Sequence, residues 1–173
     1  TYSRALAVAS ALESSLTIDF KRIVALDKVI EERQFTFVYQ PIVDSITHRP
    51  IAYEALCRPS ASEFAGPAEL FETAEYAARV ADLGRACRTI SIAPLADLPE
   101  DCSLFINLHP SELAPALLHE AALEPWSSRI VLEITETAAI DDYERVRDVI
   151  AKLRERGFRI ALDDLGAGYA GLN

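Results

Sequence analysis

Short apolar runs rich in β-branched and aromatic residues recur along the chain and predict its strands. Five such runs lie near residues 35–40, 51–57, 103–108, 129–135 and 158–163. Residues of these types fit a pleated, half-buried surface, so each run is a candidate β-strand. The segment from Asp44 to Pro50 is short and turn-forming, and we expect the first two runs to form a hairpin-like return.

Helical periodicity fills most of the remaining sequence. Apolar residues three and four positions apart predict amphipathic helices over residues 3–16, 17–33, 67–98, 111–120 and 141–156. Gly84 is a tolerated interruption within the third of these, and Gly157 ends the last. After the hairpin, strands alternate with helices, which predicts a parallel sheet with right-handed crossovers.

We expect two parts in the chain: an N-terminal helical segment over residues 1–33 and one domain over residues 34–173. A length of 173 residues suits a single domain with one sizeable core. The first segment carries no evident chemistry. It is expected to pack against the domain, or to be a linker or dimerising helix that leads in from an upstream module.

Composition narrows the class of protein. The net charge of −10 and a pI of about 4.8 argue against a protein that binds nucleic-acid polymers through their phosphates. No apolar run approaches the roughly 18 residues needed to cross a bilayer. Three cysteines without C-x-x-C spacing suggest neither a disulfide framework nor a zinc site, so a reducing cytoplasm is the expected location.

An acidic pair ends the last strand-like run. Asp163 and Asp164 are followed by Gly166 and Gly168, whose backbones can turn tightly over a ligand. Because side chains alternate along a strand, Asp163 shares a face with Ala161 and Asp164 lies at the rim. An isolated pair of this kind is equally consistent with a β-turn in which aspartate caps the next element.

Three earlier runs also carry an oxygen-bearing side chain toward their carboxyl ends. By the same alternation Glu54, Asn107 and Glu133 each lie on one face of a strand, while their neighbours point toward covering helices. Active sites of β/α barrels are built at this end of the strands, so the three side chains and Asp163 could converge at a barrel mouth. An open doubly wound sheet would gather them less readily.

Three carboxylates and an amide that converge require a cation, since like charges at close range oppose ionisation. Oxygen ligands without His or Cys favour Mg²⁺, Mn²⁺ or Ca²⁺ over zinc. Asp163 followed by Asp164 could bridge to a second ion, and a pair of metal ions suits the hydrolysis of phosphoesters.

Several motifs in this order resemble the EAL domain, a family of bacterial phosphodiesterases that open cyclic di-GMP to linear pGpG with Mg²⁺ or Mn²⁺. The motifs cover 35–173 and are Tyr39-Gln40-Pro41-Ile42-Val43, Tyr53-Glu54-Ala55-Leu56 with Arg58, Phe105-Ile106-Asn107-Leu108, Leu132-Glu133-Ile134-Thr135-Glu136 and Asp163-Asp164-Leu165-Gly166-Ala167-Gly168-Tyr169. The resemblance implies an α/β fold, a TIM-like (β/α)8 barrel, of which this chain would hold about five strands.

The resemblance also implies roles for individual residues. Metal ligands would be Glu54, Asn107, Glu133, Asp163 and Asp164, with Glu54, Asp163 and Asp164 as catalytic residues. Gln40 and Arg58 would meet the substrate. Glu136, Gly166 and Gly168 would belong to a regulatory loop linked to a homodimer. Ca²⁺ would be inhibitory, and an upstream sensory or regulatory module would be a further partner.

The sequence departs from the family pattern in two places. Leu165 and Ala167 stand where relatives usually carry Phe and Thr, which could alter hydrogen bonding in the loop. The family continues beyond the position of Asn173 with a lysine strand, a catalytic glutamate and a substrate-contacting glutamine. We expect that this part of the domain was omitted rather than supplied by another copy.

Two other functions stay open at the level of sequence. The first is a catalytically silent EAL domain that acts as a receptor for cyclic di-GMP or as a protein-interaction module. The second is an unrelated β/α-barrel metalloenzyme, for example one that stabilises an enolate. Intact Glu54, Asn107, Glu133 and Asp163 argue against the silent domain.

Overall fold

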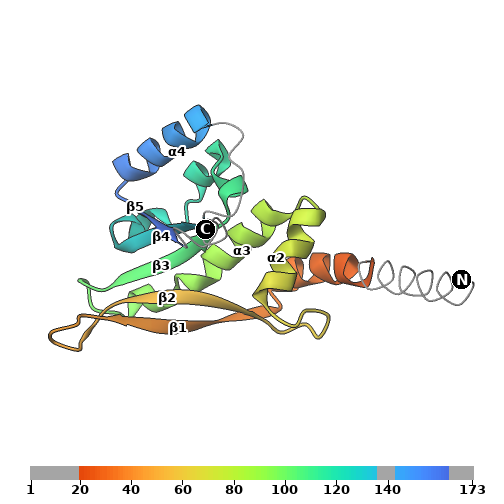
Figure 1. Cartoon of the computed structure of the whole chain (residues 1–173), viewed down its shortest axis with the longest axis horizontal. Helices are drawn as coiled ribbons and strands as arrows, with labels where there is room; N and C mark the ends of the chain where they lie inside the picture. Colours follow the sequence, from red (N-terminus) through yellow and green to blue (C-terminus); the bar gives the residue numbers. More distant parts are fainter. Residues whose placement is uncertain (1–19, 136–142, 164–173) are drawn as a thin grey trace, which may run out of the picture. The chain divides into compact units, whose positions relative to one another are not determined.

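The five expected strands form one sheet. The computed structural model describes residues 20–135 and 143–163. The strand order follows the chain, from β1 to β5 (Figure 1). The strands are β1 (Phe35–Val43), β2 (Pro50–Pro59), β3 (Ser103–Leu108), β4 (Ile130–Thr135) and β5 (Arg159–Asp163).

From β2 onward the sheet is parallel, as the alternation of strands and helices predicts. The register pairs Glu54 with Phe105 across β2 and β3, and Asn107 with Glu133 across β3 and β4. Parallel pairing continues to β5, where Thr135 lies opposite Asp163. Equivalent ends of the strands therefore meet at one edge of the sheet, which is the arrangement that a site at the carboxyl ends requires.

A hairpin joins β1 to β2, and Asp44 organises its turn. One carboxylate oxygen, Oδ1, accepts hydrogen bonds from the backbone N–H groups of Ile46 at 3.1 Å and Thr47 at 2.7 Å. The same atom accepts from the Thr47 hydroxyl at 2.8 Å. These bonds, chiefly those from Thr47, hold the pKa of Asp44 below its ordinary value.

Four α-helices are described. One covers residues 20–32, within the helix expected over 17–33, and the helix expected over 3–16 lies outside the described residues. The others are α2 (Pro67–Tyr76), α3 (Val80–Ser91) and α4 (Tyr143–Glu155). The expectation of one continuous helix over 67–98 was wrong, because the chain breaks between α2 and α3 and continues after α3 in a short 3-10 turn, η1 (Ala93–Ala96).

The break after α2 is a Schellman-type end with alanine in place of the usual glycine. Arg79 donates its N–H to the carbonyl of Ala74 at 2.7 Å, and Ala78 donates to Glu75 at 3.0 Å. Ala78 lies in the left-handed region with φ of 54°. Because this position normally carries glycine, nothing in the sequence marks the end of the helix.

The helix expected over 111–120 was also wrong. The chain forms two 3-10 turns there, η2 (Pro110–Glu112) and η3 (Pro115–His119). Ala114 between them is extended, with φ of −128° and ψ of 160°. Proline disfavours the helical conformation in the residue before it, so Pro115 prevents η2 from continuing into η3.

Contacts divide the described chain into two compact units. The first contains residues 20–36 and 58–79, and the second contains residues 37–57, 80–135 and 143–163. In the first unit, ion pairs join Arg22 to Glu69 at 2.9 Å and Arg79 to Asp27. In the described chain no helix has the length and apolar character of a membrane span.

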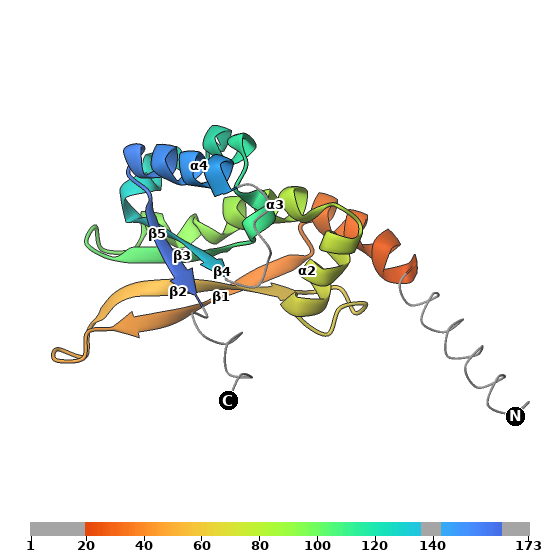
Figure 2. The same cartoon turned by 45° about the horizontal axis from the view of Figure 1, so that its top comes forward.

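The core of the second unit lies on the face of the sheet that α4 covers (Figure 2). Alternate residues of β3 and β4 point into it, together with three apolar residues of α4. They are Leu104, Ile106, Leu108, Ile130, Leu132, Ile134, Val146, Val149 and Leu153, all of them buried. This parity is the one expected from the sequence, and it places Asn107 and Glu133 on the opposite face.

Arg129 ties the starts of two strands together. Arg129 is the last residue of η4 (Glu124–Arg129), the 3-10 turn before β4. Its guanidinium donates hydrogen bonds to the carbonyl oxygens of Cys102 at 3.0 Å, Leu95 at 2.8 Å and Pro99 at 2.7 Å. These acceptors lie in the segment that leads into β3. Arg129 therefore provides hydrogen-bond donors for carbonyl groups that precede β3. These bonds hold the start of β3 next to the start of β4.

Candidate metal and phosphodiester site

Glu54 of β2 and Asn107 of β3 contact each other across neighbouring strands. The side-chain Nδ2 of Asn107 donates a hydrogen bond to Oε1 of Glu54 at 3.1 Å. Asn107 is exposed, although Ile106 and Leu108 on either side of it are buried. The bond uses the nitrogen of the amide, so the oxygen Oδ1 is not committed to it and could ligate a cation.

Glu133 extends this pair onto β4. It stands opposite Asn107 in the register of β3 and β4, and strands in a sheet are about 4.8 Å apart. The side chain is partly buried, and its Oε2 atom is fully buried. Three of the four residues that the sequence predicts to converge therefore occupy one region of three adjacent strands.

The remaining acidic residues are only partly described. Asp163 is the last residue of β5, where its backbone lies opposite Thr135. Its position at the carboxyl end of the strand agrees with the sequence prediction. Asp164, Glu136, Gly166 and Gly168 lie outside the described residues, so their roles stay predictions.

The donors present fit a hard divalent cation. Two carboxylates and one amide, from Glu54, Glu133 and Asn107, offer only oxygen ligands of the kind that Mg²⁺, Mn²⁺ and Ca²⁺ take. Among the residues with described side chains, no three His, Cys, Asp or Glu form a group that could hold a metal. Glu54 and Glu133 are two such residues, and the ligand set expected from the sequence reaches three with Asp163 and four with Asp164.

Gln40 and Arg58 are the expected substrate contacts. Both are exposed, Gln40 on β1 and Arg58 near the end of β2. By strand alternation Gln40 points away from Phe37 and Tyr39, which pack against the core. Exposure is what a substrate-binding side chain requires, and the contact itself stays a prediction.

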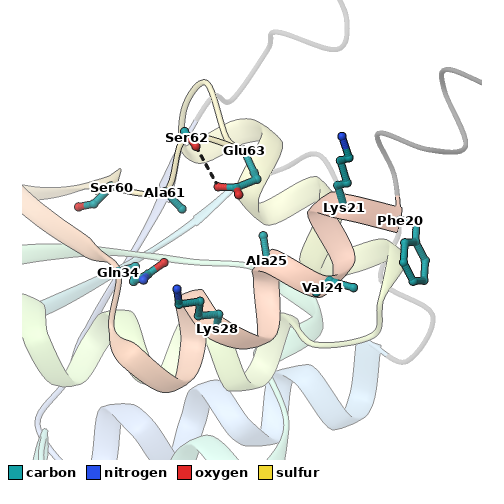
Figure 3. A pocket seen from close by; sticks show the side chains of 10 residues that line it. All are labelled: Phe20, Lys21, Val24, Ala25, Lys28, Gln34, Ser60, Ala61, Ser62 and Glu63. Atoms are coloured by element: carbon teal, nitrogen blue, oxygen red, sulfur yellow. Dashed lines mark hydrogen bonds between the residues drawn. The ribbon is translucent and has the colours of Figure 1, made fainter.

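A separate hollow of about 670 Å³ lies in the first unit (Figure 3). Its walls are the helix over residues 20–32 and the segment before α2, and Lys21 and Lys28 supply its positive charge. The lining residues are Phe20, Lys21, Val24, Ala25, Lys28, Gln34, Ser60, Ala61, Ser62 and Glu63. None of them is among the residues that the sequence predicts for the site.

Sequence reasoning missed a buried ionic cluster that follows β3. Arg88 of α3 donates to Glu112 at 2.6 Å and to both carboxylate oxygens of Glu120, at 2.6 and 2.9 Å. Arg88 and Glu112 are only 2 % and 4 % exposed. The one sequence signal was Gly84 inside a helix, because its missing side chain leaves the space that Glu112 occupies.

The ionisation of this cluster follows from its burial and its partners. Burial lowers the pKa of Arg88, but Glu120 and Glu112 outweigh that effect, so the pKa is raised. Burial raises the pKa of Glu112, and the charge of Arg88 opposes the rise. Arg88 donates three charge-assisted hydrogen bonds to the two carboxylates, and these favour the ionised forms, so the group is a triad of one cation and two anions.

Comparison with known proteins starts with a family model. The model described as the EAL domain matches residues 23–173, which is most of the chain. Among curated proteins, cyclic di-GMP phosphodiesterase PA2567 of Pseudomonas aeruginosa is 32 % identical over 165 residues. That match covers 87 % of this chain and 28 % of the relative, so the chain spans little more than a quarter of that protein.

Two solved structures show the same fold. BlrP1 of Klebsiella pneumoniae, solved with manganese and cyclic di-GMP, has a TM-score of 0.65 and 30 % identity, over 80 % of this chain and 37 % of that one. The EAL domain of Xanthomonas citri FimX, solved with cyclic di-GMP, has a TM-score of 0.73 over 87 % of this chain and 62 % of that one. At 15 % identity the latter similarity concerns the fold alone.

Proposed function

Because this chain belongs to the EAL domain family, we propose that the complete protein is a divalent-metal-dependent phosphodiesterase that hydrolyses cyclic di-GMP to linear pGpG. The fold is accordingly the TIM-like barrel of that family, of which five strands are described. The observation that carries the proposal is the contact between Glu54 and Asn107, with Glu133 opposite Asn107 in the sheet.

Five residues of the chain would hold two cations. Glu54, Asn107, Glu133 and Asp163 would hold one cation, and Asp163 with Asp164 would hold a second. When bound, Mg²⁺ or Mn²⁺ would supply charge stabilisation and an activated water for cleavage of one phosphodiester bond. The bound cations would also offset the net charge of −10, which would otherwise repel an anionic dinucleotide.

Other residues would bind the substrate and regulate the site. Gln40 and Arg58 would contact the dinucleotide, and the guanidinium of Arg58 suits a phosphate oxygen pair. Glu136 and the loop with Gly166 and Gly168 would connect the site to a homodimer and an upstream module. Ca²⁺, which prefers more ligands and a looser geometry, would occupy the site without supporting turnover.

The test is hydrolysis of cyclic di-GMP by the complete protein, with pGpG measured by chromatography. Substitution of groups that only orient metal ligands typically lowers metal affinity or activity by roughly 10–100-fold. Glu54→Ala or Asp163→Asn should reduce turnover by more than this, because each removes a proposed ligand itself. Chelation should abolish activity, and Mg²⁺ or Mn²⁺ should restore it. Glu32→Ala is the control, since its side chain is 56 % exposed and carries no proposed role.

The outcomes separate enzyme from receptor. Turnover in the wild type that both ligand variants lose supports the phosphodiesterase. Tight binding of cyclic di-GMP without turnover would favour the silent receptor instead. Substantial activity left in Glu54→Ala would contradict the role of Glu54 as a ligand.

A further inference from the structure

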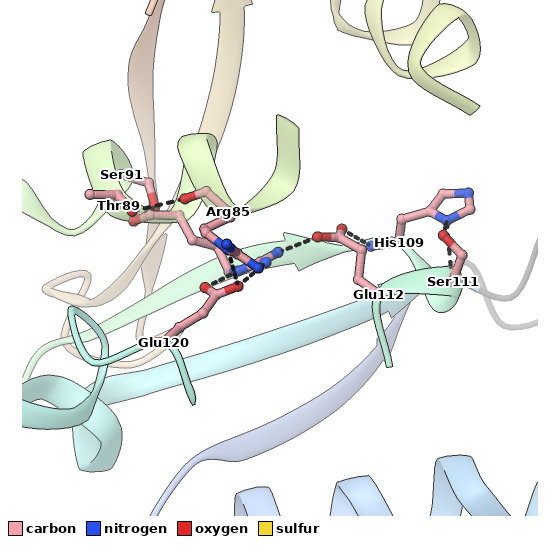
Figure 4. A network of polar contacts seen from close by, with 8 residues as sticks. Arg85, Thr89, Ser91, His109, Ser111, Glu112 and Glu120 are labelled. Atoms are coloured by element: carbon pink, nitrogen blue, oxygen red, sulfur yellow. Dashed lines mark hydrogen bonds and ion pairs between the residues drawn. The ribbon is translucent and has the colours of Figure 1, made fainter. Parts of the chain in front are cut away.

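The triad of Arg88, Glu112 and Glu120 reaches the end of β3 through one backbone group. Glu112 uses Oε1 for Arg88 and Oε2 for the N–H of His109, which donates at 3.0 Å (Figure 4). His109 is the first residue after β3 and lies two positions beyond Asn107. The last ladder pair between β3 and β4 is Leu108 with Ile134, so this N–H leaves the sheet and turns to Glu112.

The local structure around His109 adds a second anchor. Glu112 and His109 form a capping box around η2, in which the imidazole Nδ1 of His109 accepts from the N–H of Ser111 at 3.3 Å. Two hydrogen bonds therefore join His109 to η2: its N–H donates to Glu112, and its imidazole accepts from Ser111. The position of His109 is then set by where the carboxylate of Glu112 lies.

The position of Glu112 is fixed in turn by α3. Its carboxylate lies against Gly84, where an added Cβ would come within 1.8 Å of Oε1, and it bonds to Arg88 one helical turn later. Glu120 holds the other side of the same guanidinium with two bonds. A rigid helix is therefore linked to the end of β3 by Arg88, Glu112 and the N–H of His109.

We propose that Glu112, held by Arg88, is a positioning residue for the Asn107 ligand: it fixes the backbone that follows Asn107 and so orients the amide toward Glu54 and the cation. This rests on the proposed role of Asn107 as a metal ligand. Groups that orient ligands from outside the metal's own ligand set commonly cost 10–100-fold in affinity when they are removed.

Glu120 provides the matched comparison. The side chains of Glu112 and Glu120, which both bond to Arg88, are 2 % and 8 % exposed, but of the two only Glu112 accepts from the N–H of His109, two positions after Asn107, in the described structure. A purely structural role of the triad would make the loss of either carboxylate equivalent. A positioning role makes Glu112→Gln affect the site and Glu120→Gln affect stability only.

A second pair of variants leaves the triad intact. His109 has φ of −69°, which proline adopts, and it follows the extended residue Leu108. His109→Pro therefore deletes the N–H that Glu112 accepts without removing a buried charge. His109→Ala keeps that N–H and removes the imidazole, so the difference between the two isolates the backbone bond.

The experiment uses the complete protein labelled with ¹⁵N-asparagine. Without metal, His109→Pro and Glu112→Gln should shift the side-chain amide signal of Asn107, while His109→Ala and Glu120→Gln leave it in place. In Mn²⁺ titrations followed by electron paramagnetic resonance, the first two should weaken affinity about tenfold or more and the controls less than about twofold.

The outcomes are distinct. Equal Asn107 signals and equal Mn²⁺ affinities in His109→Pro and His109→Ala would overturn the positioning role. A wild-type protein that binds no Mn²⁺ would refute the proposed function, whereas the metal-free Asn107 signal would still decide whether Glu112 orients that side chain.

Discussion

A single glycine makes room for the most deeply buried carboxylate of the described chain. Gly84 lies within α3, where an added Cβ would be 1.8 Å from Oε1 of Glu112 and 2.5 Å from its Cδ. No side chain can approach so closely. The glycine, which looks like a mild interruption of a helix, is thus a steric requirement for the pair between Glu112 and Arg88.

Gly84→Ala should lower the free energy of unfolding by about 2–4 kcal/mol. Displacing one partner of a buried ion pair costs roughly 3–5 kcal/mol, and alanine recovers only about 1 kcal/mol of helix propensity. Urea denaturation followed by circular dichroism measures the change. Gly66→Ala is the control, because Gly66 precedes α2 in open space; similar losses in both variants would contradict the steric argument.

The positions of single site residues were predictable where the alternation of side chains along a strand determines the face on which a residue lies. Glu54, Asn107 and Glu133 are placed by parity alone, and the structure confirms that the first two meet. The triad of Arg88, Glu112 and Glu120 was not predictable. Its members are 24 and 32 residues apart in sequence, and only the folded positions of η2 and η3 bring them together.

Among the elements, the hairpin of β1 and β2 depends on an ionised side chain. Asp44 is partly exposed, yet three donors from Ile46 and Thr47 converge on its Oδ1. Hydrogen bonds to the charged form favour that form, which is why the pKa of Asp44 is lowered. The turn is therefore sensitive to acid.

The amide proton of Thr47 should titrate with a midpoint below 3.8, the ordinary value of the carboxyl. Because the pKa of Asp44 is lower in the folded state than in the unfolded state, its ionised carboxylate stabilises the turn at pH values above the unfolded-state pKa. This stabilisation is lost as the pH falls through the folded-state pKa. Nuclear magnetic resonance across pH 2–6 measures the shift. Asp44→Asn should remove the titration, and a midpoint above 3.8 would contradict the prediction.

Helix ends mark the limit of prediction from sequence. All five strands follow from composition and spacing, and so does α4 with its Gly157 stop. The end of α2 does not, since Ala78 occupies the left-handed position that glycine normally fills. The apolar spacing over residues 111–120 predicts one helix, but Pro115 divides this segment into two 3-10 turns.

At the scale of the whole molecule, the sheet is exposed along β5. In the described part of the chain β5 is an outermost strand, and Leu162 on it is 61 % exposed. Outer strands with exposed apolar side chains pair with other chains unless something covers them. If residues 1–173 were expressed without any following segment, we would expect them to self-associate along this strand.

Leu162→Lys should lower the average mass of the isolated chain at a given concentration, because charge on an outer strand opposes pairing between sheets. Sedimentation velocity measures the distribution. Ile46→Lys is the matched control: Ile46 is 85 % exposed but lies in the turn between β1 and β2, on neither strand and not on β5. If both substitutions reduce association equally, general hydrophobicity rather than β5 is responsible.

The contact between Asn107 and Glu54 also has an evolutionary consequence. Asn107 projects from the sheet while its neighbours Ile106 and Leu108 form the interior, so replacing it leaves the apolar packing untouched. If the proposed function holds, one codon change could end turnover without loss of the folded protein. Under that proposal, gene copies no longer selected for hydrolysis would persist as folded domains that could evolve into receptors for cyclic di-GMP.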